Sequence, residues 1–259
     1  MRIHRAVTAA AAALILLGGC AATAPTTSAA PLPAPRSTNA AKIAVIGTGN
    51  VANALGPGFA AQGNTIVYGS RNPSEQKVKD LIAKTGHGAT AAAQQDAVKG
   101  ADIVVIAVPG TAAGDVVKQL GDLSGKIILD PTNLVNRSNP DGNLDYAKPA
   151  GANSNAELIQ SLAPKAKVVK AFNTLNVGQM TAPQTAGGPI TIPICGDDAQ
   201  AKATIAGLVK GMGLEVVDLG PLRYANALEQ MLVIWGNARA HGQPFNYYLR
   251  PQPQTPPAR

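Results

Sequence analysis

A short glycine-rich segment carries the clearest chemical signal in the sequence. Gly47-Thr48-Gly49-Asn50-Val51-Ala52 has the G-x-G-x-x-A spacing and lies between an apolar run at 42–46 and a helical stretch beginning at Asn50. Gly47 permits a tight turn, Gly49 lets backbone amides approach a pyrophosphate, and the small Ala52 lets a helix pack close to a strand. The N-terminus of that helix adds partial positive charge. The segment predicts a dinucleotide site, with a purely structural turn as the alternative.

The region about 20 residues further on indicates which dinucleotide. NAD sites usually place Asp or Glu there to accept from the ribose hydroxyl, but Tyr68-Gly69-Ser70-Arg71-Asn72-Pro73 contains no acid. Ser70 can donate to a 2′-phosphate, and Arg71 can pair with it bidentately or stack on adenine. The pattern favours NADP; a solvated loop cation is the alternative for Arg71.

Short apolar runs alternate with helical stretches after residue 41, which predicts a Rossmann-type, doubly wound α/β fold with a mainly parallel sheet and a small helical C-terminal part. Gly56-Pro57-Gly58 interrupts the first helix, where we expect a kink or early stop. The strands are expected at 42–46, 65–68, 102–108, 126–129, 167–171, 190–195 and 214–219. The helices are expected at 50–62, 74–84, 113–120, 156–162, 199–212 and 223–240, with long loops at 130–153 and 172–189.

Other reactive side chains favour structural interpretations. His87 and His241 are expected in solvent, and Asp197 and Asp198 are expected to cap the helix at 199–212. Cys195 follows an apolar run and reads as a core thiol. No HExxH, CxxC or Ser/His/Asp spacing occurs, so we assign no metal and no catalytic residue. For the C-terminal rings, core or interface positions are expected and a flavin platform is the alternative, at Trp235, Phe245, Tyr247 and Tyr248.

Composition limits the broad class. The 259 residues are 46% hydrophobic and 14% charged with only 2 Cys, which excludes a disulfide scaffold, a collagen-like repeat and a highly charged disordered chain. The net charge of +7 is dispersed along the chain, so no nucleic-acid partner is expected.

The first 41 residues read as processing segments. Arg2 and Arg5 precede an apolar stretch at 6–17, shorter than the roughly 20 residues that span a bilayer. Leu17-Gly18-Gly19-Cys20 follows and resembles a bacterial lipobox, which implies cleavage and acylation at Cys20. We expect an exported, membrane-anchored lipoprotein; a mis-assigned start and a cytoplasmic protein is the alternative. The predicted parts are a signal peptide at 1–19, a disordered tether at 20–41, an NADP-binding oxidoreductase domain at 42–250 and a Pro-rich tail at 251–259.

Several segments together resemble the coenzyme F420-dependent NADP oxidoreductase family, over about residues 42–250. The cytosolic reductase domain of six-transmembrane metalloreductases is also similar. The resemblance rests on segments 47–50, 69–73, 102–109, 170–174, 195–198 and 218–222. It implies NADP(H) bound with a second planar redox acceptor, such as F420 or FMN, stacked opposite the nicotinamide in a cleft built partly by the C-terminal segment.

The resemblance also implies roles for individual positions. Thr48, Asn50 and Val51 would line the phosphates. Ala171 would present its backbone to the carboxamide, and the edge of the ribose and nicotinamide would be formed by Val108, Pro109 and Gly110. Family members often carry a bulky residue where this chain has Gly110.

The leading hypothesis is hydride transfer between NADPH and a flavin or deazaflavin, which needs alignment more than an acid or base. The alternatives are an exported lipoprotein that binds a dinucleotide or partner without turnover, and an NADPH-dependent ferric or flavin reductase. A small-molecule acceptor and the membrane are the expected partners, and a homodimer is left open.

Overall fold

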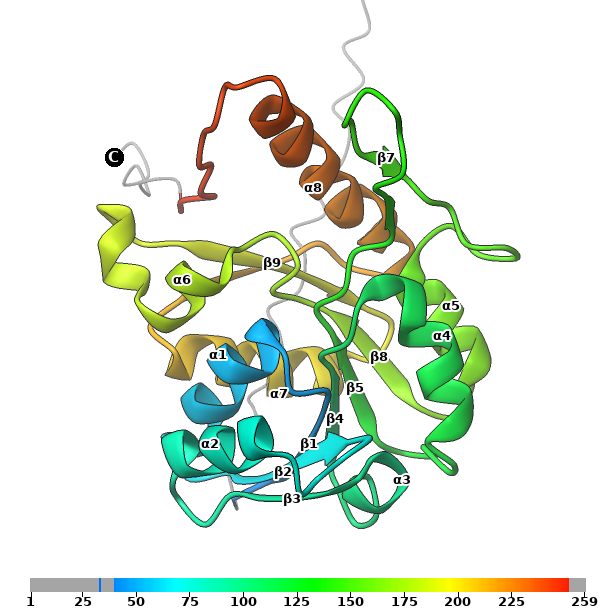
Figure 1. The fold of residues 1–259 in the computed structure, drawn as a ribbon, viewed down its shortest axis with the longest axis vertical. Helices are drawn as coiled ribbons and strands as arrows, with labels where there is room; N and C mark the ends of the chain where they lie inside the picture. Colours follow the sequence, from blue (N-terminus) through cyan, green and yellow to red (C-terminus); the bar gives the residue numbers. More distant parts are fainter. Residues whose placement is uncertain (1–32, 34–39, 252–259) are drawn as a thin grey trace, which may run out of the picture. The chain divides into compact units, whose positions relative to one another are not determined.

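The computed structural model describes residue 33 and residues 40–251. The predicted signal peptide, the lipidation site Cys20, most of the tether and the tail beyond 251 lie outside these residues. A single eight-stranded sheet has the order β10-β9-β8-β5-β4-β1-β2-β3 (Figure 1). The strands are β1 (Lys42–Ile46), β2 (Thr65–Ser70), β3 (Thr90–Ala93), β4 (Ile103–Ile106), β5 (Ile127–Asp130), β8 (Lys167–Lys170), β9 (Thr191–Gly196) and β10 (Glu215–Asp218).

The strand directions confirm the predicted mainly parallel sheet. Every neighbouring pair in the order is parallel except β8 and β9, which are antiparallel. The carboxyl ends of β1, β2, β4, β5 and β8 therefore meet at one edge of the sheet. The chain runs from β1 outward to β2 and β3, then returns to β4 on the other side of β1. Ligands of doubly wound folds bind at such a reversal.

Helices cover both faces of the sheet, which confirms the doubly wound fold (Figure 1). Side chains alternate along β1: Ile43 and Val45 enter one apolar cluster and Ala44 and Ile46 the other. The first cluster includes residues of α1 (Asn50–Ala60), α2 (Gln76–Thr85) and α7 (Ala199–Gly211). The second includes residues of α3 (Gln94–Ala97), α4 (Gly110–Gln119), α5 (Asn155–Leu162) and α8 (Ala225–Ala240).

The structure contains several short strands and helices that the sequence patterns did not predict. β3 is an alanine-rich, partly exposed edge strand, so it lacks the apolar alternation of a buried strand. The long loops contain the short pair β6 (Val135–Asn136) and β7 (Asp145–Tyr146), the helix α6 (Val177–Thr181) and the 3-10 turn Pro183–Ala186. A second 3-10 turn, Leu222–Tyr224, precedes α8. None of the helices in the described residues is long and apolar enough to cross a membrane.

The predicted early stop of the first helix is wrong, since α1 continues through Pro57 to Ala60. Proline has no N–H to donate to the carbonyl of Asn53 one turn earlier. That carbonyl instead accepts from Lys84 Nζ at 3.3 Å. Gly56, the residue before Pro57, lets α1 pack closely against Tyr68, because a Cβ on Gly56 would lie 1.9 Å from Tyr68 Oη.

Candidate functional site

The turn between β1 and α1 is built around two glycines with different tasks. Gly47 has φ of +111°, and a Cβ there would lie 2.3 Å from the carbonyl oxygen of Ala107. Gly49 precedes α1 in extended conformation, and nothing lies within 4 Å of where its Cβ would be. α1 has no side-chain cap and no acidic residue in its first turn. Free N–H groups at an open helix N-terminus form a cradle suited to a phosphate.

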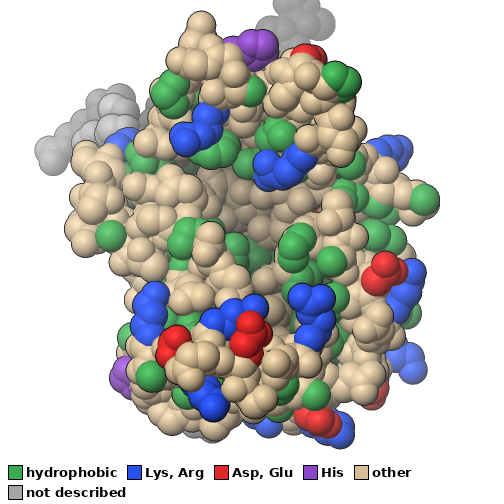
Figure 2. Space-filling view, in the orientation of Figure 1, with side chains coloured by type: hydrophobic (Ala, Val, Ile, Leu, Met, Phe, Trp, Pro, Cys, Tyr) green, Lys and Arg blue, Asp and Glu red, His purple; other side chains and the backbone are tan. Residues whose placement is uncertain are grey.

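The remaining predicted residues gather at the same edge of the sheet. Ser70 ends β2, Val108 to Gly110 follow β4, and Ala171 follows β8. The Gly47 N–H donates to Gly69 O at 2.9 Å, which holds the glycine turn beside the end of β2. The face shown in Figure 2 is hollowed near its centre, between α1 below and α8 above in this view.

Ser70 and Arg71 differ sharply in exposure. Ser70 is buried, and its Oγ accepts from the N–H of Asn72 at 3.1 Å, which leaves its hydroxyl proton to donate elsewhere. Arg71 is exposed, and among the described residues its guanidinium has no hydrogen-bond or ion-pair partner. The five N–H donors of the Arg71 guanidinium are therefore free to bind an anion, and Arg71 directly follows β2, whose end is bonded to the glycine turn.

Gly110 has a packing reason that the sequence does not show. α4 begins at Gly110, with Pro109 as its N-cap residue. A Cβ on Gly110 would lie only 2.1 Å from the carbonyl oxygen of Asn133, in the segment that follows β5. A bulkier residue at this place would clash with that segment. Gly110 thus permits a close approach of two backbones at the predicted nicotinamide edge.

The exit of β8 is strained. Ala171 is buried, and its N–H donates to Asp130 O at 3.3 Å. The next residue, Phe172, has φ of +66°, a conformation that bulky residues rarely adopt. Its ring is buried and meets Phe59 edge-on, with centroids 6.1 Å apart. Strain of this kind persists only where the surroundings fix the backbone, and it concentrates at functional sites.

A buried charged cluster is centred on Lys170, the last residue of β8, and the sequence analysis did not predict it. Lys170 Nζ is 2.9 Å from Asp130 Oδ2 and 2.7 Å from Glu229 Oε1, and all three side chains are fully buried. Burial alone would lower the pKa of the Lys170 ammonium, but the two carboxylates raise that pKa above its ordinary value. One signal was available: Lys170 interrupts an apolar run between Val169 and Ala171, and charged residues are rarely buried unless paired.

The structural interpretations of the other reactive side chains are confirmed except at Asp197, which was expected to cap α7 and instead holds the turn before α8. Asp198 caps α7 by accepting from the N–H of Ala201 at 2.7 Å, while Asp197 accepts from the N–H of Leu222. Cys195 is fully buried in β9, and burial raises the pKa of its thiol to about 12. His87 and His241 are exposed.

The C-terminal aromatic residues differ in exposure: Trp235, Tyr247 and Tyr248 are half-buried, and Phe245 is exposed. Tyr248 packs against the first apolar cluster, and Tyr247 donates from its hydroxyl to Met231 O at 2.9 Å. Phe245 is exposed, with its ring centroid 5.7 Å from that of Tyr247. Trp235 lies under the guanidinium of Arg239. Core or interface positions therefore describe Tyr247 and Tyr248, and Phe245 is the most accessible of the three rings after α8.

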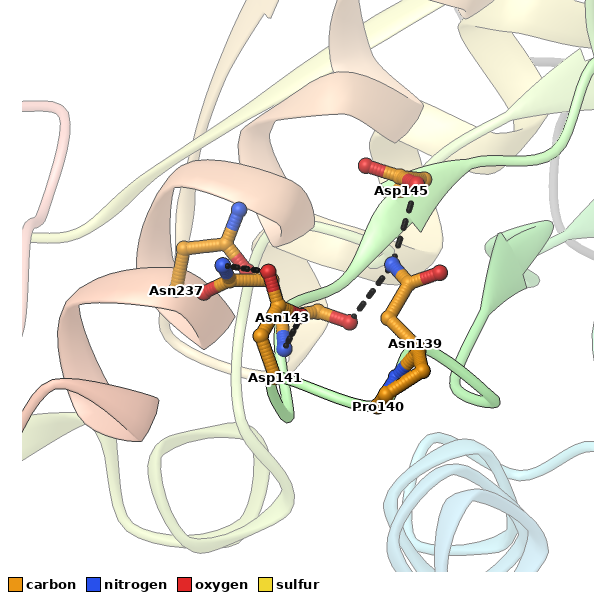
Figure 3. A pocket seen from close by; sticks show the side chains of 6 residues that line it. All are labelled: Asn139, Pro140, Asp141, Asn143, Asp145 and Asn237. Carbon is orange, nitrogen blue, oxygen red and sulfur yellow. Dashed lines mark hydrogen bonds between the residues drawn. The ribbon is translucent and has the colours of Figure 1, made fainter.

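A separate pocket lies in the β6–β7 region (Figure 3). Its lining residues are Asn139, Pro140, Asp141, Asn143, Asp145 and Asn237. Asn139 donates to Asp145, and Asn143 donates to Asp141, so these side chains largely satisfy one another (Figure 3). None of the predicted cofactor-binding residues lines it.

Comparison with known proteins agrees with this geometry. The family described as "NADP oxidoreductase coenzyme F420-dependent" matches residues 42–134. The solved structure of a candidate F420-dependent NADP reductase from Arthrobacter sp. FB24 is 32% identical, with a TM-score of 0.71 over 80% of this chain and 96% of its own. The chain belongs to the F420-dependent NADP oxidoreductase family. That family is described as one of NADP oxidoreductases.

Other relatives extend the comparison. A hypothetical protein from Sinorhizobium meliloti, SMa0349, is 31% identical, with a TM-score of 0.59 over 70% of this chain and 86% of its own. Rat metalloreductase STEAP3 is 30% identical over 190 residues, which are 73% of this chain and 36% of the metalloreductase. The chain thus spans about a third of the length of the curated relatives it matches. A reductive aminase from Aspergillus terreus in complex with NADPH, 20% identical, shares the fold.

Proposed function

We propose that the protein binds NADPH at the carboxyl edge of its sheet and transfers hydride to a flavin or a deazaflavin such as coenzyme F420. The observation that carries this proposal is the uncapped N-terminus of α1 behind Gly49, beside the exposed Arg71. The open space at Gly49 fits a pyrophosphate, because any side chain there would fill the approach to the amides.

Different residues would bind different parts of NADPH. The backbone of Gly47 to Val51 would hold the pyrophosphate, and Ser70 and Arg71 would hold the 2′-phosphate. The ribose and nicotinamide would lie between Val108 to Gly110 and the backbone of Ala171. Bound NADPH supplies a hydride, and the chain aligns the nicotinamide with the acceptor ring. The apolar side chains of Val108 and Pro109 would help to exclude water there.

Turnover with defined acceptors tests the proposal. Purified protein is mixed with NADPH and either coenzyme F420 or FMN, and the loss of NADPH absorbance is followed. Arg71→Ala should slow the reaction at low NADPH, whereas Arg223→Ala, at an exposed arginine of the turn before α8, should not. Tight NADPH binding without turnover would instead support the alternative of a dinucleotide-binding protein.

The similarity to a metalloreductase favours a second candidate, reduction of ferric iron through a flavin. Rat metalloreductase STEAP3 matches over 73% of this chain at 30% identity. Ferric iron accepts one electron at a time, so a flavin would have to divide the hydride's two electrons between two ferric ions. NADPH oxidation by a ferric chelate that requires added FMN would favour this candidate over direct reduction of F420.

The proposed location is an exported lipoprotein anchored through Cys20, and its support is the lipobox-like sequence alone. A mass spectrum of the N-terminal peptide distinguishes this location from a cytoplasmic one. An acylated Cys20 at the new N-terminus, lost on treatment with an inhibitor of lipoprotein signal peptidase, is the expected result. An intact Met1 would contradict the anchor.

A further inference from the structure

We propose that the buried cluster of Asp130, Lys170 and Glu229 is a positioning device for the nicotinamide end of the groove. The proposal rests on the function proposed above, because it concerns how the chain holds one half of NADPH. The three residues act through the backbone segments that they connect, and none of them would touch the cofactor.

The cluster joins separate parts of the chain at one point. Lys170 ends β8, Asp130 ends β5, and Glu229 comes from α8. Glu229 also accepts from the backbone N–H of Asn155 at 3.0 Å and of Ala156 at 3.3 Å, the first residues of α5. One carboxylate therefore fixes α5 and α8 to the lysine that precedes Ala171.

Hydrogen bonds extend the cluster to the start of α4. Lys170 Nζ donates to the carbonyl oxygen of Thr132, and the Thr132 hydroxyl accepts from Asn155 Nδ2 at 2.6 Å. The same amide group reaches the carbonyl oxygen of Gly110 at 3.2 Å. The position of Gly110, on one side of the expected nicotinamide, thus depends on groups bound to the cluster.

The segment Ala171–Phe172, on the other side of the expected nicotinamide, is held by hydrogen bonds at both of its ends. Lys170 holds the chain before Ala171, and Asn173 Nδ2 holds it after the strained Phe172 by donating to Leu228 O at 2.8 Å. Leu228 and Glu229 are adjacent in α8. A single turn of α8 therefore fixes both ends of the segment that carries Ala171 and Phe172.

Stability alone explains the cluster poorly. Removing three charged groups from water is costly, and well-packed apolar side chains of similar volume often stabilise a protein as well or better. Fixed hydrogen-bond directions, by contrast, hold several loops in one arrangement. That property is what a site needs to keep a planar ring aligned.

Binding of two ligands tests the proposal without relying on turnover. 2′,5′-ADP carries the adenosine end and lacks the nicotinamide, whereas NADPH carries both. In Glu229→Gln we expect NADPH affinity to fall roughly tenfold while 2′,5′-ADP affinity stays unchanged. Asp218→Asn is the matched control: it breaks the partly buried pair between Asp218 of β10 and Lys202 of α7, neither of which belongs to the cluster, and it should alter neither affinity.

A second variant keeps the test informative where Glu229→Gln does not fold. Thr132→Val removes the acceptor for Asn155 without changing any charge, and it should lower NADPH affinity selectively. Equal losses for both ligands, or unchanged NADPH binding in a folded variant, would overturn the positioning role. Wild-type protein that binds neither ligand would refute the proposed function itself, and the inference would go with it.

Discussion

The carbonyl oxygen of Ala107 lies 2.3 Å from the position that a Cβ would occupy on Gly47. The end of β4 therefore presses directly against the turn that leaves β1. The φ of +111° at Gly47 excludes an ordinary side chain independently. Gly49, two residues later, is under neither constraint, since it has φ of −85° and open space around it.

These two glycines should respond differently to substitution. Gly47→Ala should lower the free energy of unfolding by more than ~2 kcal/mol, because it adds both a clash and backbone strain. Gly49→Ala should cost about 1 kcal/mol or less, yet weaken NADPH binding roughly tenfold by filling the phosphate approach. Urea denaturation and NADPH titration of both variants measure this. A Gly49→Ala protein with unchanged NADPH affinity would remove the pyrophosphate from this turn.

Arg71 should set the preference between the two nicotinamide cofactors. Arg71→Ala should lose roughly 1.5–3 kcal/mol of NADPH binding, about tenfold to 100-fold, because a charge-assisted pair with the 2′-phosphate disappears. NADH lacks that phosphate, so its affinity should change little. Fluorescence titrations with both cofactors measure the ratio, and Arg223→Ala is a control at another exposed arginine. Equal losses for both cofactors would contradict the assignment.

Local patterns predicted the central strands and the glycine turn, because both depend on neighbouring residues. β1 shows its apolar run, and Gly47 and Gly49 stand where that run ends. The buried cluster could not be found this way, since Lys170, Asp130 and Glu229 are brought together from positions up to 99 residues apart. The expected early stop at Pro57 was wrong for the same reason: the group that bonds the carbonyl left without a partner is Lys84, on another helix.

Cys195 should behave as a protected thiol. Burial raises its pKa to about 12, so almost no thiolate exists near neutral pH, and the side chain is out of reach of reagents. In a Cys20→Ser variant, which removes the other cysteine, a thiol reagent should react slowly with native protein and at once after unfolding in urea. Rapid labelling of the native protein would show that β9 opens, or that the thiol is accessible.

Asp198 should make the stability of α7 depend on pH. Its side chain caps the helix at Ala201 and lies 3.0 Å from Lys167, and these contacts hold its pKa below the ordinary value of 3.8. The ionised form is therefore favoured in the folded state, so its stabilisation is present above about pH 4 and disappears as the pH falls through the lowered pKa. Asp198→Ala should cost about 1 kcal/mol near neutral pH through loss of the cap.

The difference between wild type and Asp198→Ala should shrink as the pH falls below about 4, because the unfolded chain then binds a proton that the folded cap disfavours. Urea denaturation across this range measures it. Asp115→Ala provides the matched control, because Asp115 pairs with Lys118 on the exposed face of α4 and caps nothing. Exposed pairs of this kind contribute well under ~1 kcal/mol, so that variant should stay close to wild type at every pH. A cost at Asp198 that remained constant down to about pH 3 would mean that the charge does not strengthen the cap, and that lost packing accounts for the effect.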